Sequence, residues 1–310
     1  MMSMIYDTII VGSGAAGLSA AVYAARAELK FIVIEKIYMG TGQIAESERV
    51  DNYLGLYGEN GFDLGEKFRA HAEALGTEFA EGDVSKIIPE NGIYKLITDE
   101  AKYEAKTVIY AAGASHRKLG IKGEEELAGR GVSYCAVCDG AFYKGKTVAV
   151  IGGGDTALGE ALYLSDIAQK VYLIHRRNEF RGNRSLCSRV AAKENIEAVM
   201  SAVPEEITGE SRVDGIVVSI DGNVKKLDTD GVFVAVGTAP ASSPLDGVVK
   251  MNDSGYIVAG EDCITSDKGI FAAGDVREKP LRQVITAAAD GANSVYSAEK
   301  YLRETGRAEQ

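Results

Sequence analysis

Apolar runs and helical patterns alternate from the start of the chain. Tyr6 to Val11 and Phe31 to Ile34 are apolar runs of strand length. Between them, the Ala-rich stretch from Leu18 to Glu28 has the pattern of a helix that faces a core. The order strand, helix, strand predicts a βαβ unit with two parallel strands.

The same order recurs near the middle of the chain. Thr147 to Ile151 and Val171 to Ile174 read as strands, with a helical pattern from Thr156 to Ala168 between them. The sequence therefore predicts a second βαβ unit.

The last third adds further strand-like runs and one long helix. The apolar runs cover 231–237 and 269–275, and a helical pattern covers 283–302. The second run ends in Gly274-Asp275, which can place a carboxylate at a cofactor hydroxyl. The helix start at Gln283 could face an electron-rich ring.

A glycine motif follows the first predicted strand. Residues 12–17 read Gly-Ser-Gly-Ala-Ala-Gly, and Glu35 stands eighteen residues beyond Gly17. In this context Gly12 makes the tight turn, Gly14 lets a pyrophosphate approach, and Gly17 lets helix and strand pack. Glu35 can accept hydrogen bonds from a ribose. The alternative is an ordinary glycine-rich turn.

A related motif follows the second strand. Residues 152–157 read Gly-Gly-Gly-Asp-Thr-Ala, and His175 stands at the offset that Glu35 has in the first unit. Arg176, Arg177 and Arg181 come next. An arginine fork binds a 2′-phosphate that a carboxylate would repel, so this site favours NADP. The alternative is a solvated surface patch.

Composition narrows the class of protein. The length of 310 residues suits about two domains, and the net charge of −11 disfavours nucleic acid as a partner. No apolar run reaches the roughly 18 residues of a membrane helix. Met1 to Tyr6 carries no positive charge and leads directly into Asp7, so we expect no signal peptide and a cytoplasmic location.

The chain has four cysteines, too few for a disulfide scaffold. Cys135 and Cys138 form a Cys-x-x-Cys motif, which suggests either a redox pair or half of a zinc site. Zinc would need two further ligands, and Cys187 and Cys263 are isolated in the sequence. We therefore expect a redox pair and no metal site. Asp139 could supply a proton to a leaving thiolate, or it could cap a helix.

Taken together, these motifs resemble the low-molecular-weight bacterial thioredoxin reductases, which are NADPH-dependent flavoprotein disulfide reductases. The resemblance extends over essentially the whole chain. It includes Val50-Asp51-Asn52-Tyr53, residues 130–135 (RGVSYC) and residues 271–287 (FAAGDVREKPLRQVITA).

The resemblance implies an α/β fold with two Rossmann-like, three-layer ββα nucleotide-binding domains. The FAD-binding domain would be discontinuous, comprising 1–117 and 245–310, and the NADPH-binding domain with the cysteines would be inserted as 118–244. The protein would be a homodimer that reduces thioredoxin or a thioredoxin-like protein. Because the cysteines and the nicotinamide site would share one domain, we also expect that domain to rotate during turnover.

The resemblance also implies roles for individual residues. Cys135 and Cys138 would be the redox pair, with Asp139 as acid/base. The FAD contacts would be Gly12, Ser13, Gly14, Ala16, Gly17, Glu35, Lys36, Gln43, Asn52, Gly113, Gly274, Asp275, Arg282, Gln283 and Val284. The NADPH contacts would be Gly152, Gly154, Asp155, Thr156, Ala157, His175, Arg176, Arg177 and Arg181.

Some positions depart from the common family pattern. Ala15 replaces a frequent Pro, Val137 a common Thr, and Gly159 a usual Glu, and Asp155-Thr156 is a mild variant of Asp-Ser. Val137 could change the disulfide potential or the partner fit, and Gly159 could weaken NADPH binding. None of these departures removes a reactive group.

Related proteins of other function are separable by motif. A ferredoxin-dependent flavin disulfide reductase would lack the NADPH motifs. The flavoprotein of an alkyl hydroperoxide reductase would carry thioredoxin-like modules before the first glycine motif. A flavin redox sensor without turnover would have little use for the arginine cluster, although only an assay separates it from an enzyme.

Overall fold

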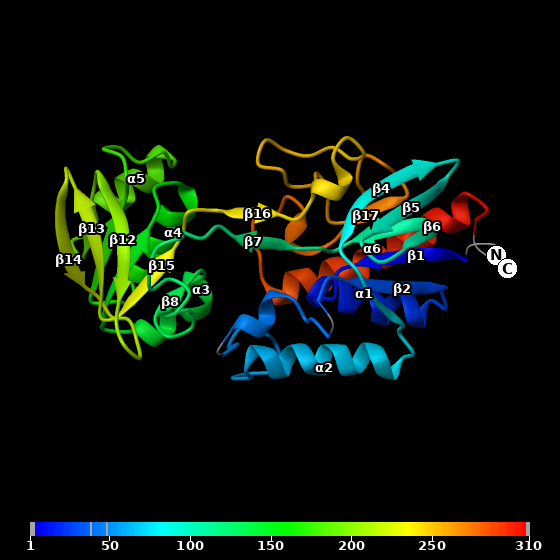
Figure 1. Cartoon of the computed structure of the whole chain (residues 1–310), viewed down its shortest axis with the longest axis horizontal. Coiled ribbons are helices and arrows are strands. Elements are labelled where there is room, and N and C mark those ends of the chain that lie inside the picture. The colour runs from blue at the N-terminus through cyan, green and yellow to red at the C-terminus, as the bar shows by residue number, and fades with distance from the viewer. Residues whose placement is uncertain (1–3, 38, 48, 308–310) are drawn as a thin grey trace. The chain divides into compact units, whose positions relative to one another are not determined.

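The computed structural model describes residues 4–37, 39–47 and 49–307 (Figure 1). The chain forms two compact units. Unit 1 comprises Met1–Ser115 with Ala239–Gln310, and unit 2 comprises His116–Thr238.

Unit 1 is built on a parallel sheet that continues into an antiparallel hairpin. The parallel strands lie in the order β3-β2-β1-β6, with β17 on the other side of β6, and β5 and β4 extend the sheet from β6 in antiparallel pairing. The strands are β1 (Ile5–Val11), β2 (Phe31–Glu35), β3 (Phe79–Glu81), β4 (Val84–Glu90), β5 (Ile93–Thr98), β6 (Lys102–Tyr110) and β17 (Ile270–Ala272).

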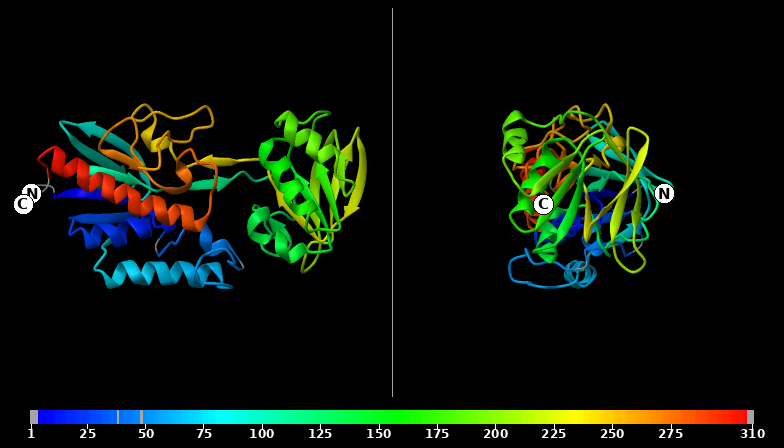
Figure 2. Two further views of the ribbon diagram at one scale, coloured as in Figure 1. Left: turned by 180° about the vertical axis from the view of Figure 1, so that it is seen from behind. Right: turned by 90° about the vertical axis from the view of Figure 1, so that its left-hand side faces the viewer.

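Helices cover one face of the parallel strands. They are α1 (Ala15–Arg26), α2 (Gly61–Ala74) and α6 (Val284–Glu304), with short turns η1 (Gln43–Glu46), η3 (Ser243–Leu245) and η4 (Gly274–Val276). Helices α1 and α6 run side by side (Figure 2). Successive side chains of β1 point to opposite faces of the sheet. Ile10 packs with the helices on one face, whereas Ile9 and Val11 pack with apolar residues of β4 and β5 on the other.

Unit 2 also has a parallel sheet with helices, but its antiparallel strands form a sheet of their own, a three-stranded meander. A parallel sheet has the order β11-β10-β9-β15-β8, and an antiparallel sheet has the order β12-β13-β14. The strands are β8 (Val132–Ser133), β9 (Thr147–Ile151), β10 (Lys170–Ile174), β11 (Ile196–Val199), β12 (Ala202–Thr208), β13 (Gly215–Ile220), β14 (Asn223–Asp228) and β15 (Gly231–Val234). The helices are α3 (Ala136–Asp139), α4 (Asp155–Ser165) and α5 (Arg184–Ala191), with the turn η2 (Gly140–Tyr143).

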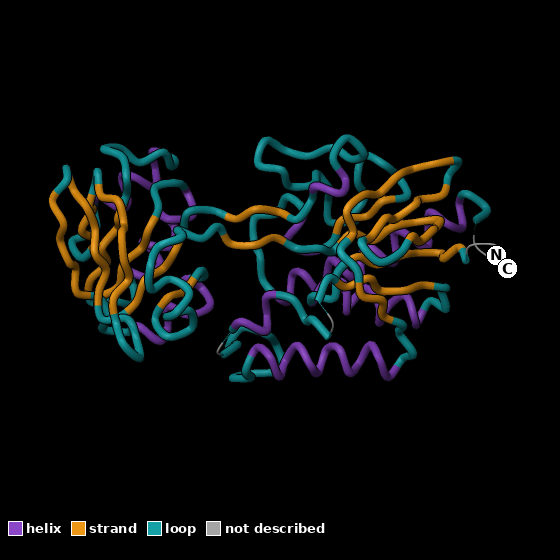
Figure 3. Tube along the Cα trace, in the orientation of Figure 1, coloured by secondary structure: helices purple, strands orange, loops and turns teal. Residues whose placement is uncertain are grey.

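Strand β9 again separates two layers of the core. Val148 and Val150 pack with the helices, whereas Ala149 and Ile151 pack with the meander. Both units are thus three-layered, with helices, a parallel sheet and antiparallel strands (Figure 3). The predicted α/β class with two Rossmann-like units is confirmed.

The chain crosses between the units twice. The crossings contain β7 (Ala114–His116) and β16 (Thr238–Pro240), which pair as a two-stranded sheet. Within the described part of the chain, no helix combines the length and apolarity needed to span a membrane.

Candidate functional site

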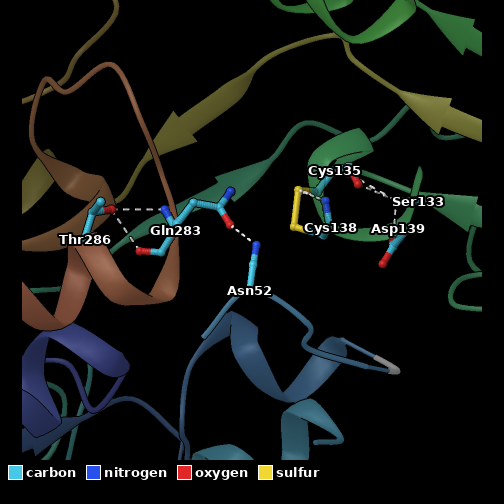
Figure 4. Close-up of a disulfide and its surroundings, with 7 residues drawn as sticks. All are labelled: Asn52, Ser133, Cys135, Cys138, Asp139, Gln283 and Thr286. Atoms are coloured by element: carbon cyan, nitrogen blue, oxygen red, sulfur yellow. Dashed lines mark hydrogen bonds between the residues drawn. A yellow bond between two sulfur atoms is a disulfide. The ribbon is translucent and has the colours of Figure 1, made fainter. Parts of the chain in front are cut away.

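The two cysteines of the Cys-x-x-Cys motif are joined in a disulfide (Figure 4). Cys135 precedes helix α3 and Cys138 lies within it. The backbone N–H of Cys138 donates a hydrogen bond to the Cys135 Sγ atom at 3.2 Å. A donor at this sulfur stabilises a thiolate when the disulfide opens. The arrangement favours the redox interpretation over the zinc half-site.

Ser133 ties the cysteine loop to Asp139. The Ser133 Oγ donates to Asp139 Oδ2 at 2.6 Å, and the Cys135 N–H donates to Ser133 Oγ at 3.1 Å. Asp139 occupies the N-cap position of η2, but its side chain makes no capping hydrogen bond there. The helix-cap interpretation of Asp139 is therefore not supported, and the carboxylate is held one residue from Cys138.

The first glycine motif forms the turn between β1 and α1. Gly12 has φ 103°, and a Cβ there would lie 2.5 Å from the Ala111 carbonyl oxygen. A Cβ on Gly17 would lie 1.8 Å from the Gly12 carbonyl oxygen. At Gly14, by contrast, the nearest protein atom would be Gly42 Cα at 3.8 Å. Protein packing thus explains Gly12 and Gly17, while Gly14 leaves room for a ligand. Ser13 and Ala16 are buried in the same turn.

Glu35 ends β2 in an ion pair that the sequence did not indicate. Arg69 of α2 donates from Nη1 to Glu35 Oε2 at 2.7 Å and from Nη2 to Oε1 at 3.1 Å. The Met39 N–H also donates to Oε1, at 3.2 Å. The carboxylate is therefore fixed in orientation, and Oε2 retains acceptor capacity for a hydroxyl. Its neighbour Lys36 is exposed and pairs with Asp83 at 2.7 Å.

Asp275 and Arg282 follow β17, and each has a shielded polar atom without a partner. Asp275 Oδ1 and Arg282 Nε are buried and make no hydrogen bond in the described structure. Burial raises the pKa of Asp275, while Lys279 and Arg282 act to lower it. The Arg282 guanidinium lies over the Tyr256 ring at 4.3 Å. These two atoms are left available for a polar partner beyond the described residues.

Asp290 of α6 secures the Gly274-Asp275 turn. Its Oδ2 accepts from the Gly274 N–H at 2.9 Å and from Lys279 Nζ at 2.8 Å, and its Oδ1 accepts from Arg277 Nη2 at 2.7 Å. The Asp290, Arg277 and Lys279 side chains are all buried. The sequence analysis did not identify Asp290. An acidic residue on the apolar face of a long helix could have indicated a buried ion pair at this position.

The remaining predicted FAD contacts lie on loops and helix starts of unit 1. Asn52 Nδ2 donates to Gln283 Oε1 at 2.7 Å, and the Gln283 N–H donates to Thr286 Oγ1 at 3.2 Å (Figure 4). Gln43 begins η1, Val284 begins α6, and Gly113 has φ 72° with open space where a Cβ would point. The structure thus links Asn52 to Gln283 across a large sequence separation.

The second glycine motif resembles the first in the space around its glycines. A Cβ on Gly152 would lie 2.4 Å from the Ala235 carbonyl oxygen, whereas a Cβ on Gly154 would meet nothing within 4 Å. Ala157 is fully buried and Thr156 is exposed. Gly154, like Gly14, is a glycine that the protein's own packing does not require.

Two hydrogen bonds hold the loop after β10 against this turn. The Arg181 N–H donates to the Gly153 carbonyl at 2.8 Å, and the Asn183 N–H donates to Asp155 Oδ1 at 2.6 Å. Arg181 is exposed, as are Arg176 and Arg177. The structure therefore brings the backbone of Arg181 to the glycine turn, and all three arginines act electrostatically on the neighbouring His175.

His175 lies at the start of that loop and is buried. Its Nε2 is shielded and has no partner among the described residues. Burial lowers the pKa of His175, and the nearby Arg181 lowers it further. The neutral form of the imidazole is thus favoured, and one shielded ring nitrogen is left without a protein partner among the described residues.

The two units therefore fit nucleotide ligands by the same criteria. Each has a glycine whose Cβ direction is clear, at a helix start suited to phosphate. Each also has buried polar atoms without a protein partner. The described residues of either unit contain no cluster of ligating side chains that could hold a metal ion.

One acidic residue near the disulfide was not predicted. Glu160 lies on α4, and its carboxyl accepts a hydrogen bond from the backbone of Ala136. Its Oε2 is shielded and unpartnered among the described residues. The available signal was a carboxylate between the buried residues Ala157 and Ala161 of a helix.

Comparison with known proteins gives consistent matches over the whole chain. The family model for Pyridine nucleotide-disulphide oxidoreductase matches residues 6–291. The thioredoxin reductase of Bacillus subtilis (strain 168) is 43% identical over 304 residues, covering 97% of this chain and 96% of the relative. That of Treponema pallidum (strain Nichols) is 42% identical over 300 residues, covering 96% and 97%. The crystal structure of thioredoxin reductase from Streptococcus pyogenes MGAS5005 matches with a TM-score of 0.91 and 39% identity, covering 97% of this chain and 99% of that chain.

Proposed function

Because the chain belongs to the pyridine nucleotide-disulphide oxidoreductase family, and within it to the low-molecular-weight thioredoxin reductases, we propose that it uses NADPH to reduce the disulfide of thioredoxin or a thioredoxin-like protein. The observation that carries the proposal is the Cys135–Cys138 disulfide with a backbone donor at Cys135 Sγ. In balanced form, NADPH, a proton and a protein disulfide give NADP⁺ and a protein dithiol.

Unit 1 is the FAD-binding part in this proposal. The turn that Gly12 and Gly17 shape would contact FAD, with Gly14 facing the pyrophosphate, Glu35 a ribose, and Asp275 a cofactor hydroxyl. The unpartnered Asp275 Oδ1 and Arg282 Nε support this assignment, because a bound flavin nucleotide would supply their missing partners. When bound, FAD accepts a hydride and passes two electrons to a disulfide.

Unit 2 is the NADPH-binding part and carries the redox pair. Gly152, Gly154 and Asp155 would lie at the pyrophosphate, and Arg176, Arg177 and Arg181 would bind the 2′-phosphate. The three arginines are exposed, and the Arg181 backbone bonds to Gly153 of the glycine turn. This supports the assignment, because a guanidinium group forms charge-assisted bonds to phosphate.

The sulfur chemistry follows from the contacts of the cysteine loop. Once the Cys135–Cys138 bond is reduced, a thiolate attacks the substrate disulfide and one substrate sulfur leaves. By family resemblance Cys135 is this interchange thiol and Cys138 faces the flavin. The Cys138 N–H stabilises the Cys135 thiolate. Asp139, held by Ser133, is the group that would exchange a proton with the leaving sulfur.

Further parts of the proposal concern assembly and location. A homodimer and a cytoplasmic site of action are expected from the resemblance, and thiols kept reduced in the cytoplasm suit a dithiol enzyme. The exposed Val137 between the cysteines is a surface that a thioredoxin would contact.

A reconstituted assay tests the proposal. The purified flavoprotein is mixed with NADPH, thioredoxin and a disulfide dye, and NADPH oxidation and dye reduction are followed together. We expect oxidation of one NADPH per disulfide, dependent on thioredoxin. A parallel arm supplies reduced ferredoxin instead of NADPH. Activity only in that arm, or reduction of the flavin without turnover in both arms, would contradict the proposal.

A further inference from the structure

Glu160 is an acidic side chain in an otherwise apolar part of helix α4. Ala157, Leu158, Ala161 and Leu164 around it are buried in the core of unit 2. The Oε2 atom of Glu160 is shielded from solvent and makes no hydrogen bond within the described structure. No hydrogen bond among the described residues therefore accounts for this oxygen atom.

The carboxyl of Glu160 is directly connected to the redox loop. It accepts a hydrogen bond from the backbone N–H of Ala136. That N–H belongs to the peptide bond that Cys135 itself forms, and helices α3 and α4 pack against each other. The charge on Glu160 therefore lies at the peptide group that joins Cys135 to Ala136.

Glu160 changes charge near neutral pH. Burial raises the pKa of its carboxyl to about 7, against the opposing effect of the Ala136 N–H. None of the ionisable side chains on the elements packed against α4 contributes to this pKa. These side chains are Asp139 and, once reduced, Cys138 on α3, Lys170 and Tyr172 on β10, and Arg184, Cys187 and Arg189 on α5.

Two opposite influences then act on the Cys135 sulfur. The Cys138 N–H, 3.2 Å from Sγ, favours the thiolate at every pH. An ionised Glu160 disfavours it, because a second negative charge nearby raises a thiol pKa. A protonated Glu160 leaves only the favourable influence.

We propose that Glu160 is a positioning residue that controls, through its own charge, the pH range in which Cys135 is a thiolate. The proposal rests on the redox role of Cys135 and Cys138 in the proposed function. It concerns proton equilibria only: the thiol loses its proton to solvent, and no electron is transferred.

The test measures the thiol directly. The holoenzyme is reduced with dithiothreitol, desalted under nitrogen, and treated with iodoacetamide between about pH 5.5 and 9.5. Fragmentation mass spectrometry reports Cys135 separately from Cys138, Cys187 and Cys263. In the wild type we expect a titration spread over more pH units than one independent group requires, because Glu160 ionises in the same range.

The variant E160Q keeps an oxygen that can accept from Ala136 but removes the charge. We expect it to lower the pKa of the Cys135 thiol by about half to one unit and to give a single-step titration. A purely structural role would leave the pKa unchanged, because glutamine keeps the hydrogen bond. An E160Q profile that superimposes on the wild type would overturn the proposal.

Two controls sharpen the comparison. D166N removes an exposed charge at the end of the same helix, where Asp166 pairs with Lys193, and should leave the profile unchanged. E160D restores a carboxyl and should keep the broad wild-type profile. If circular dichroism shows that E160Q does not fold, the wild-type titration alone tests the proposal. A single-step titration of Cys135 then overturns it, and a broadened titration supports it.

This experiment needs neither NADPH nor thioredoxin. A shifted thiol pKa in E160Q, combined with no thioredoxin reduction by the wild type, would refute the proposed function and leave the role of Glu160 intact. Thioredoxin reduction by the wild type, combined with an unshifted Cys135 pKa in E160Q, would support the proposed function and refute the role of Glu160.

Discussion

Arg69 donates two hydrogen bonds to the carboxylate of Glu35, at 2.7 and 3.1 Å, and both side chains are buried. The same guanidinium lies over the ring of Phe79 at 4.0 Å and bonds to Glu73 at 2.8 Å. A pair of this kind fixes the direction of a carboxylate at the end of β2, where a ribose acceptor is expected.

We predict that R69L destabilises unit 1 strongly. It would leave Glu35 buried with its charge unpaired, at a cost of about 3–5 kcal/mol. The double variant E35L/R69L should recover much of that loss, because both charges are removed together. Urea unfolding followed by circular dichroism measures the effect. Equal losses in the single and double variants would show that the ion pair itself contributes little.

We predict that the arginines after β10 select NADPH over NADH. Replacing Arg176, Arg177 or Arg181 with Gln should raise KM for NADPH, because a charge-assisted bond to phosphate contributes about 1.5–3 kcal/mol, or roughly tenfold to a hundredfold. The KM for NADH should change little. R212Q, an exposed charge in the turn between β12 and β13, is the matched control. Equal use of both nucleotides by the wild type would contradict the assignment.

We predict that C135S and C138S abolish thioredoxin reduction while the flavin can still be reduced by NADPH. The hydride step involves no sulfur, whereas disulfide exchange requires both cysteines. Stopped-flow absorbance of the flavin and steady-state turnover separate the two steps. C187S should retain both, since Cys187 is a free thiol on α5. Full turnover in either single variant would exclude the redox pair.

We predict that Cys263 resists alkylation in the native protein. Burial, and then Asp290, raise the pKa of this thiol to about 12, so the reactive thiolate is negligible at pH 8. Unfolding exposes the thiol and removes the cause of its raised pKa. Cys263 should therefore react with iodoacetamide once urea unfolds the chain. Peptide mass spectrometry after iodoacetamide, without and with urea, measures this. Rapid native labelling of Cys263 would count against the burial.

We predict that G159A stabilises the protein. Gly159 lies within α4, its φ is not positive, and a Cβ there would meet nothing within 4 Å. Alanine in a helix interior is favoured over glycine by about 0.5–1 kcal/mol. The melting temperature should therefore rise slightly. A lower melting temperature would mean that the open space beside Gly159 is needed.

The sequence predicted the parts of the fold that have a clear period or motif. Strands β1, β2, β9 and β10 and helices α1, α4 and α6 agree with the predicted segments, with ends that shift by a few residues. These segments combine buried apolar runs with glycine turns, so local pattern and tertiary structure agree. The chemical pairing of Cys135 with Cys138 was likewise indicated by spacing.

Other features depend on contacts that no local pattern records. The meander β12 to β14 has mixed polarity because only one face is buried, and β14 is largely exposed. The ion pair of Arg69 with Glu35 joins residues from two elements. The approach of Glu160 to Ala136 depends on how α4 packs on α3. The nucleotide contacts, the domain rotation and the homodimer stay predictions.

The pairing of β7 with β16 brings the two ends of the inserted unit together, which bears on whether that segment of the chain could be removed or exchanged. The first and last residues of unit 2 lie on neighbouring strands, so a short linker in place of unit 2 would have only a small gap to span. The strands β1 to β6 and β17 and the helices α1, α2 and α6 all remain encoded after such a deletion. The chain is thus divided into a host unit and an inserted unit whose two ends lie on neighbouring strands.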